Sequence, residues 1–111
     1  MGLFDMFKGA ASADEISHDD LVSALQAKSV ALVDVREPGE YTAGHVEGAA
    51  NLPLSRFDAN LLPKGKPVVL ICRSGGRSSQ ALAKAHGAGL TDVRHYRGGV
   101  MGWSSAGGNL V

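Results

Sequence analysis

The heptapeptide CRSGGRS at positions 72–78 is the part of the chain whose residue types are best suited to chemistry. A cysteine reacts as its thiolate, and the neighbouring positive charges of Arg73 and Arg77 favour that form over the thiol. The Gly75-Gly76 pair lets the backbone curl tightly enough to aim several N–H groups at one point, which makes a nest for an anion. The spacing therefore predicts a nucleophilic Cys72 inside an anion-binding loop.

This loop is predicted to lie between a strand and a helix. The apolar run Val68-Val69-Leu70-Ile71 precedes it and predicts a buried strand, and residues 77–86 after it predict a helix. In an open parallel sheet, ligands bind beyond the carboxyl ends of the strands, which is where Cys72 would lie. The unpaired N–H groups and the positive dipole end of the following helix would stabilise a Cys72 thiolate there.

The remaining segments alternate between helix and strand. Further strands are predicted over residues 30–35, 49–52 and 93–96. Helices are predicted to begin after Ser17, which forms a capping-box pattern with Asp20, at Pro38 with a stop at Gly44, over residues 55–60, and after Gly98-Gly99. Because parallel strands need crossover connections, we expect an α/β domain with a central, mostly parallel sheet and helices on both faces.

Composition limits the classes of function. The 111 residues suit one domain, and eleven basic against eleven acidic side chains leave no net charge to attract nucleic acid or anionic lipid. No apolar stretch is long enough for a transmembrane segment. A single cysteine excludes an internal disulfide and suits a reducing, cytoplasmic setting. Since the histidines are scattered and no second cysteine exists, we expect no metal site and no cofactor.

Three regions are expected along the chain. Residues 1–13 form an N-terminal arm in which Leu3, Phe4 and Phe7 have helical spacing. The arm is either one short amphipathic helix that docks elsewhere, or a terminal segment that is folded back on its own domain or frayed. Residues 14–107 form the domain, and residues 108–111 form a C-terminal tail.

Several other side chains are interpreted as structural. Asp34 and Arg36 are expected to support the loop by pairing beside it, although a catalytic role is the alternative. His45 is expected to make hydrogen bonds in a turn, because a preformed thiolate needs no general base. The sequence offers no partner for His18, His86 or His95, and Tyr41 and Trp103 are expected to pack in the core.

Several motifs together resemble the rhodanese family. The loop at 72–78 after an apolar strand resembles the rhodanese active-site loop. Its companions are the segments Asp34-Val35-Arg36-Glu37 with Glu40-Tyr41, Gly44-His45-Val46-Glu47-Gly48-Ala49 with Asn51-Leu52-Pro53, and Gly98-Gly99-Val100-Met101-Gly102-Trp103. Their order within one short chain makes the resemblance specific, and it implies a small rhodanese-like fold.

The resemblance implies a sulfurtransferase. Cys72 would take a sulfane sulfur from thiosulfate or a persulfide donor, carry it as a persulfide, and pass it to a thiol or to cyanide; a protein donor or acceptor is a further partner to consider. The substrate-binding residues would be Arg73, Ser74, Gly75, Gly76 and Arg77, with Asp34, Arg36 and Ser78 in support. At least one arginine is expected to contact the sulfonate of the donor, although Arg77 could instead bond carbonyls of the loop.

Two other functions remain as alternatives. Phosphatases and arsenate reductases can use a similar cysteine, but related dual-specificity phosphatases have a loop longer by one residue, with arginine six positions after cysteine. Here that position is Ser78 and the arginine is Arg77. The other alternative is a persulfide carrier or docking module that meets a protein partner through residues 1–13.

Overall fold

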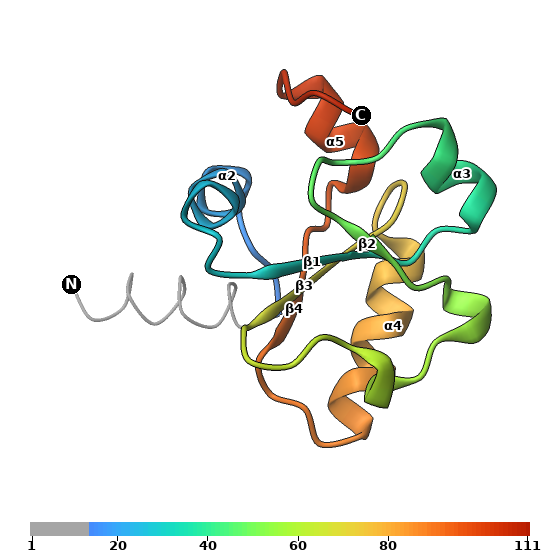
Figure 1. The fold of residues 1–111 in the computed structure, drawn as a ribbon. Helices are drawn as coiled ribbons and strands as arrows, with labels where there is room; N and C mark the ends of the chain where they lie inside the picture. Colours follow the sequence, from blue (N-terminus) through green and yellow to red (C-terminus); the bar gives the residue numbers. More distant parts are fainter. Residues whose placement is uncertain (1–13) are drawn as a thin grey trace.

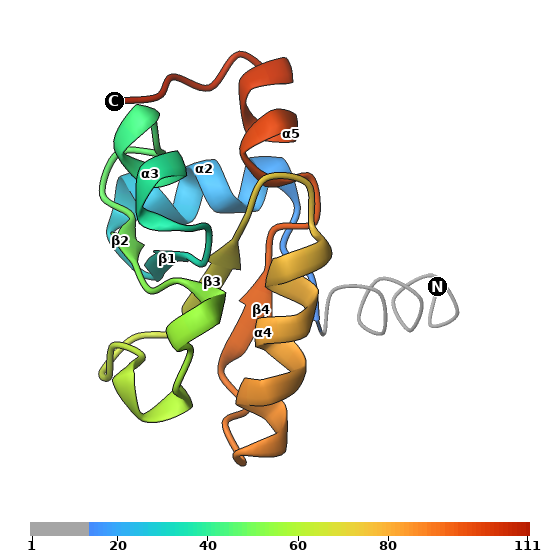
Figure 2. The same cartoon turned by 90° about the vertical axis from the view of Figure 1, so that its right-hand side faces the viewer.

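A four-stranded sheet forms the centre of the molecule. The structure is a computed structural model, and it describes residues 14–111. The strands are β1 (Ala31–Asp34), β2 (Ala50–Asn51), β3 (Val68–Ile71) and β4 (Val93–His95), and all adjacent pairs run parallel in the order β2-β1-β3-β4. Figure 2 shows this order across the molecule. The parallel sheet confirms the predicted fold class, whereas the predicted arm at residues 1–13 lies outside the described residues.

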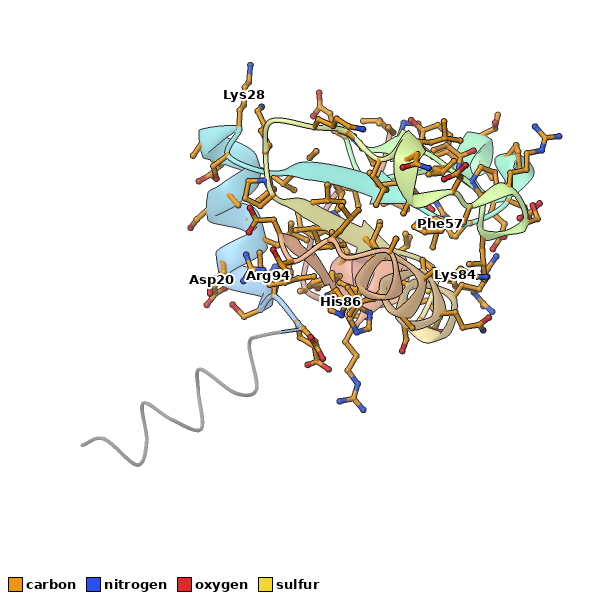
Figure 3. All side chains as sticks on the ribbon, turned by 90° about the horizontal axis from the view of Figure 1, so that it is seen from below. Asp20, Lys28, Phe57, Lys84, His86 and Arg94 are labelled. Atoms are coloured by element: carbon orange, nitrogen blue, oxygen red, sulfur yellow. The ribbon has the colours of Figure 1, made fainter. Side chains whose placement is uncertain are left out.

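Helices cover both faces of the sheet. Helix α2 (His18–Ala27) lies above the sheet in Figure 1, and α4 (Gly76–Gly87) lies below it. Helix α3 (Pro38–Ala43) follows β1, and α5 (Gly99–Ser105) follows β4. Seen from below in Figure 3, α4 carries Lys84 and His86 on the near side of the molecule. Within residues 14–111 no helix is long and apolar enough to cross a membrane.

The strands divide their side chains between two cores, as the two-residue period of a strand requires. The core on the α2 side includes Leu32, Val69 and Ile71, joined by Leu21 of α2 and by Trp103 of α5. The core on the α4 side contains the strand residues at the alternate positions, such as Val33 and Leu70. Ala81 and Leu82 of α4 and the side chain of Cys72 complete it. Cys72 therefore leaves β3 on the side that α4 covers.

The ends of the first helices follow the sequence signals. The Ser17 side chain accepts a hydrogen bond from the Asp20 amide at 3.1 Å and begins α2. Pro38 is the first residue of α3, and Gly44 follows its last residue. Both assignments confirm the prediction, because a capping side chain and a proline at the first helical position each suit the unpaired amides of a helix start.

The helix predicted over residues 55–60 is wrong. The chain instead makes two 3₁₀ turns, Leu54–Arg56 and Ala59–Leu61. Phe57 and Asp58 between them have extended backbone angles, because Phe57 packs against the core on the α4 side and the Asp58 carboxylate accepts from the Asn60 amide at 2.9 Å.

The last residues pair with the segment after α3. His45 and Val111 exchange backbone hydrogen bonds of 3.1 and 2.8 Å, and the Trp103 indole donates to the Asn109 carbonyl at 3.0 Å. The His45 ring stacks on Tyr41 and donates through Nδ1 to the Tyr41 carbonyl at 2.8 Å. His45 thus makes the turn hydrogen bonds that the sequence indicated.

Candidate active site

The loop that carries Cys72 is a tight connection between β3 and α4. Strand β3 ends at Ile71, and α4 begins at Gly76 with Gly75 as its N-cap. Gly75 has a φ of +101°, and a Cβ there would lie 2.5 Å from the Arg97 carbonyl oxygen. Only glycine fits such a position without displacing the neighbouring backbone.

The first turn of α5 holds the other side of this loop. The amides of Val100 and Met101 donate to the carbonyls of Cys72 and Arg73 at 2.8 and 3.1 Å. Gly99 has a φ of +67°, and a Cβ there would overlap these same two carbonyls. Figure 2 shows the loop arching from β3 toward the base of α5 before α4 begins. Because the C=O and N–H of a trans peptide point in opposite directions, this contact turns the next amides away from α5.

The Cys72 sulfur is buried and surrounded by donors. The side chain is 1% exposed, and Sγ lies 3.1 Å from the Gly75 amide and 3.5 Å from Ser78 Oγ. Burial opposes ionisation and is the largest influence on the thiol. The hydrogen bonds from the Ser78 hydroxyl and from the amides of Ser78, Ser74 and Gly75 together outweigh it, so the pKa of Cys72 lies below its usual value. The site thus favours a thiolate, as the loop sequence predicts.

The loop also presents free donors for an anion. The amides of Arg73, Gly76 and Arg77 have no acceptor among residues 14–111. Gly76 and Arg77 open the 12-residue helix α4, whose N-terminal dipole adds to the attraction for negative charge. The Arg73 side chain is exposed and, in the described part of the chain, makes no ion pair or hydrogen bond. The loop therefore offers unpaired amides and an exposed guanidinium to an anionic group.

Arg77 pairs with a residue that sequence reasoning missed. Its Nη1 and Nη2 donate to the two carboxylate oxygens of Glu40 on α3 at 2.6 and 2.9 Å. The hydrogen bond from Arg77 is the largest influence on Glu40 and lowers the pKa of that carboxyl to about 2. The same contact raises the pKa of Arg77. The alternative in which Arg77 bonds loop carbonyls is not what the described residues show.

Asp34 and Arg36 form a buried pair beside the loop, as expected. Asp34 is opposite Ile71 in the register of β1 and β3. Arg36 Nη2 lies 2.8 Å from the Asp34 carboxylate and 2.7 Å from the Gly44 carbonyl, and Nε lies 3.0 Å from both Asp34 oxygens. The pair joins the end of β1 to the end of α3 and touches none of the atoms around the Cys72 sulfur. This geometry is compatible with the predicted supporting role, which stays a prediction.

Ser78 connects the site to His95. Its hydroxyl lies 2.9 Å from His95 Nδ1 and 3.2 Å from the Gly75 carbonyl oxygen. No sequence pattern indicates a partner for His95, because β4 meets the start of α4 only in the folded structure. His18 and His86 also have partners, Tyr96 Oη at 2.9 Å and the Val93 carbonyl at 3.1 Å, but neither contacts the loop.

Residues 14–111 form no cluster of metal ligands, and a groove that they form lies away from Cys72. Within residues 14–111 no group of three or more His, Cys, Asp or Glu side chains is placed to hold a metal ion. A groove of about 820 Å³ is lined by residues of α2, β1 and the segment around Val46 to Ala50, and the 72–78 loop takes no part in it.

Comparisons with known proteins agree with this architecture. A family model described as a rhodanese-like domain matches residues 17–106. Thiosulfate sulfurtransferase GlpE of Shewanella oneidensis is 33% identical over 98 residues, which cover 86% of this chain and 96% of that protein. The human single-domain sulfurtransferase TSTD1 has a TM-score of 0.74 and 29% identity, with 85% of this chain and 97% of that chain covered.

Other relatives are longer. An uncharacterized protein of Synechocystis is 44% identical over 94 residues, which cover 83% of this chain, but the chain spans only 52% of that protein's length. MoeZ of Mycobacterium tuberculosis, a probable adenylyltransferase/sulfurtransferase, is 35% identical over 100 residues, which cover 86% of this chain. The chain spans only 26% of the length of MoeZ. The match over residues 17–106 nevertheless includes the sheet, the loop and α5, and it shows that the chain belongs to the rhodanese-like domain family.

Proposed function

We propose that this chain is a sulfurtransferase that carries a sulfane sulfur on Cys72 as a persulfide. The observation that carries the proposal is the buried Cys72 sulfur between β3 and α4, whose thiolate form is favoured by hydrogen bonds from the Ser78 hydroxyl and from loop amides such as that of Gly75. Membership of the rhodanese-like family and the names of relatives such as GlpE and TSTD1 support sulfur transfer.

Loading of sulfur is a displacement at the outer sulfur of the donor. With thiosulfate, the Cys72 thiolate attacks that sulfur, the new S–S bond forms, and the old S–S bond breaks with its electron pair leaving on sulfite. The products are a Cys72 persulfide anion and sulfite, and the total charge is unchanged. Because the attacking group is a thiolate, the lowered pKa of Cys72 increases the fraction of the reactive form at a given pH.

The loop would hold the anionic groups of this step. In this proposal the loop amides from Arg73 to Arg77 would bind the terminal sulfur of the persulfide. The free guanidinium of Arg73 would bind the sulfonate through two or more of its donors. Arg77 would contact the same group, with Glu40 fixing its orientation and compensating part of its charge.

Release of sulfur needs an acceptor from outside the chain. No second cysteine is present to attack the persulfide. A thiol or cyanide would attack the terminal sulfur, the S–S bond would break, and the electron pair would return to Cys72 Sγ as thiolate. We include a protein donor or acceptor among the candidate partners. The single cysteine favours a reducing, cytoplasmic setting for this cycle.

The test is the intact mass of the protein after incubation with thiosulfate. We expect a gain of one sulfur atom that is lost on addition of cyanide, with thiocyanate formed in the same amount. Cys72→Ala should gain no sulfur. A wild-type protein that never gains sulfur, or a Cys72→Ala variant that still gains it, would show that the proposal is wrong. Hydrolysis of an aryl phosphate that is lost in Cys72→Ser would favour the phosphatase alternative instead.

A further inference from the structure

A chain of hydrogen bonds runs from the Cys72 sulfur through Ser78 to His95. Sγ lies 3.5 Å from Ser78 Oγ, and that oxygen lies 2.9 Å from His95 Nδ1. The three side chains come from the end of β3, the first turn of α4 and the end of β4. They are 1%, 0% and 6% exposed, so water does not compete freely for these contacts.

The Ser78 hydroxyl has more neighbours than it can satisfy as a donor. It carries one proton, and its oxygen lies within reach of Cys72 Sγ, of His95 Nδ1, and of the Gly75 carbonyl at 3.2 Å. The Gly75 carbonyl also accepts from the Ser79 amide at 3.0 Å, so it does not depend on Ser78. The direction of the Ser78 proton is therefore decided by the sulfur and the imidazole.

The charge of the Cys72 sulfur determines whether Nδ1 of His95 accepts or donates a hydrogen bond. When Cys72 is a thiol, its S–H can donate to Ser78 Oγ, and the hydroxyl is then free to donate to the unprotonated Nδ1 of His95 or to Gly75. When Cys72 is a thiolate, the hydroxyl donates to the sulfur. An unprotonated Nδ1 would then face an oxygen lone pair at 2.9 Å, whereas a protonated Nδ1 would donate to it. The thiolate state therefore requires the proton on Nδ1.

The surroundings of His95 favour a neutral ring. Burial is the main influence and lowers the pKa of His95; Arg97 acts in the same direction, and Glu15 and Asp14 act against it. The His95 amide donates to the Asp14 carbonyl at 2.9 Å, which fixes the backbone on that side. The charged and titratable groups around the ring are thus Asp14, Glu15 and Arg97 beside β4, together with Cys72 beyond Ser78.

We propose that His95, with its proton on Nδ1, is a positioning residue that turns the Ser78 hydroxyl toward the Cys72 sulfur. This inference rests on the proposed function only for its consequence in sulfur transfer. In loading, the thiolate is the nucleophile, and in release the same sulfur is the leaving group. A donor held on Sγ stabilises the charge in both, and a leaving thiolate of lower pKa departs faster.

The test is the pH titration of the Cys72 thiolate, followed by its ultraviolet absorbance in the full chain. Because Cys72 is the only cysteine, the Cys72→Ala variant supplies the baseline. His95→Leu removes the donor and should raise the titration midpoint by about one pH unit, which is a tenfold loss of thiolate at a given pH. His95→Asn places an amide the same number of bonds from Cα as Nδ1, so we expect it to retain the wild-type midpoint.

The Ser78→Ala variant shows whether His95 acts on Cys72 through Ser78 or whether its substitution disturbs the site in general. Ser78→Ala should itself raise the Cys72 midpoint, and adding His95→Leu to it should raise the midpoint no further. A shift of equal size from His95→Leu in both backgrounds would overturn the proposal. So would an unchanged midpoint in His95→Leu, or an Asn variant that behaves like the Leu variant.

The wild-type protein also offers a test that needs no variant for its readout. Nitrogen NMR of the histidine rings distinguishes the two tautomers, and His95→Asn identifies the signal by its loss. We expect the Nδ1–H form at a pH where Cys72 is ionised, and the Nε2–H form there would overturn the proposal. These measurements use no sulfur donor. A Cys72 that never takes up sulfur would therefore refute the proposed function and leave the coupling to His95 standing.

Discussion

Substitution of Gly99 by alanine should disturb the Cys72 loop more than the same change at another glycine of similar backbone. Gly99 has a φ of +67°, and its Cβ would overlap the carbonyls that α5 holds. Gly89 has a φ of +90° but has nothing within 4 Å of its added Cβ. The two variants therefore share the backbone strain, and only Gly99→Ala collides with the loop.

The expected magnitudes follow from these contacts. A left-handed φ costs alanine about 1–2 kcal/mol, and the smaller freedom of its unfolded chain returns about half of that. Gly89→Ala should then lower the free energy of unfolding by about 0.5–1 kcal/mol. At Gly99 the loop must also move, which breaks the hydrogen bonds from Val100 and Met101 at about 1 kcal/mol each. Gly99→Ala should lose about 3 kcal/mol.

Activity should separate the two variants further. Displacing Cys72 and its amides by about 1 Å can slow a reaction roughly a hundredfold, so Gly99→Ala should lose thiosulfate-to-cyanide transfer while Gly89→Ala retains it. Urea unfolding and the transfer rate of both variants are the two assays. If Gly99→Ala lost no more stability than Gly89→Ala and transferred sulfur at the wild-type rate, the role assigned to α5 in shaping the loop would be refuted.

Two further variants test the ion pairs around the loop. Asp34→Asn leaves Arg36 without its partner in a buried place, so urea unfolding should show a loss of about 3–5 kcal/mol; a loss below about 1 kcal/mol would contradict the supporting role. Glu40→Gln should lower stability at neutral pH by at most about 1 kcal/mol, because the Glu40 side chain is 36% exposed. Since the pKa of Glu40 falls from 4.5 to about 2 on folding, its contribution is complete above pH 4.5 and is lost as the pH drops toward 2. Wild type should therefore lose more stability than Glu40→Gln across that range, and equal losses would refute the pairing with Arg77.

The sequence predicted the parts of the fold that depend on local signals. The sequence predicts the strand at Val68–Ile71 and the helix starts at Ser17 and Pro38, because apolar runs, capping side chains and proline act within a few residues. The sequence does not predict the conformation of residues 55–60, because that conformation depends on Phe57 packing against a core formed by distant strands.

The residues of the candidate site also fall into those that local sequence predicts and those that only the fold brings together. The loop residues were predictable because they are contiguous, and the pairing of Asp34 with Arg36 because the two are separated by one residue. Glu40 and His95 lie 37 and 17 residues from the loop side chains that they contact, and only the fold brings them there. Gly99 was visible as a helix entry, but its contact with the Arg73 carbonyl follows from the packing of α5 on the loop.

The two helices that meet at the loop use their N-termini in opposite ways. The N-cap amide of α4, that of Gly75, donates to the Cys72 sulfur, whereas the amides of Val100 and Met101 in α5 donate to the carbonyls of Cys72 and Arg73. A peptide whose carbonyl is held presents its N–H on the other side, so the contact with α5 turns the amides of Arg73 and Ser74 away from α5. Gly99 thus controls the shape of the loop, and Glu40 holds the orientation of Arg77. His95 controls the direction of the Ser78 hydroxyl proton. These are separable properties. A variant of Gly99 should change stability and rate together, whereas a variant of His95 should change the pH dependence of the thiolate first.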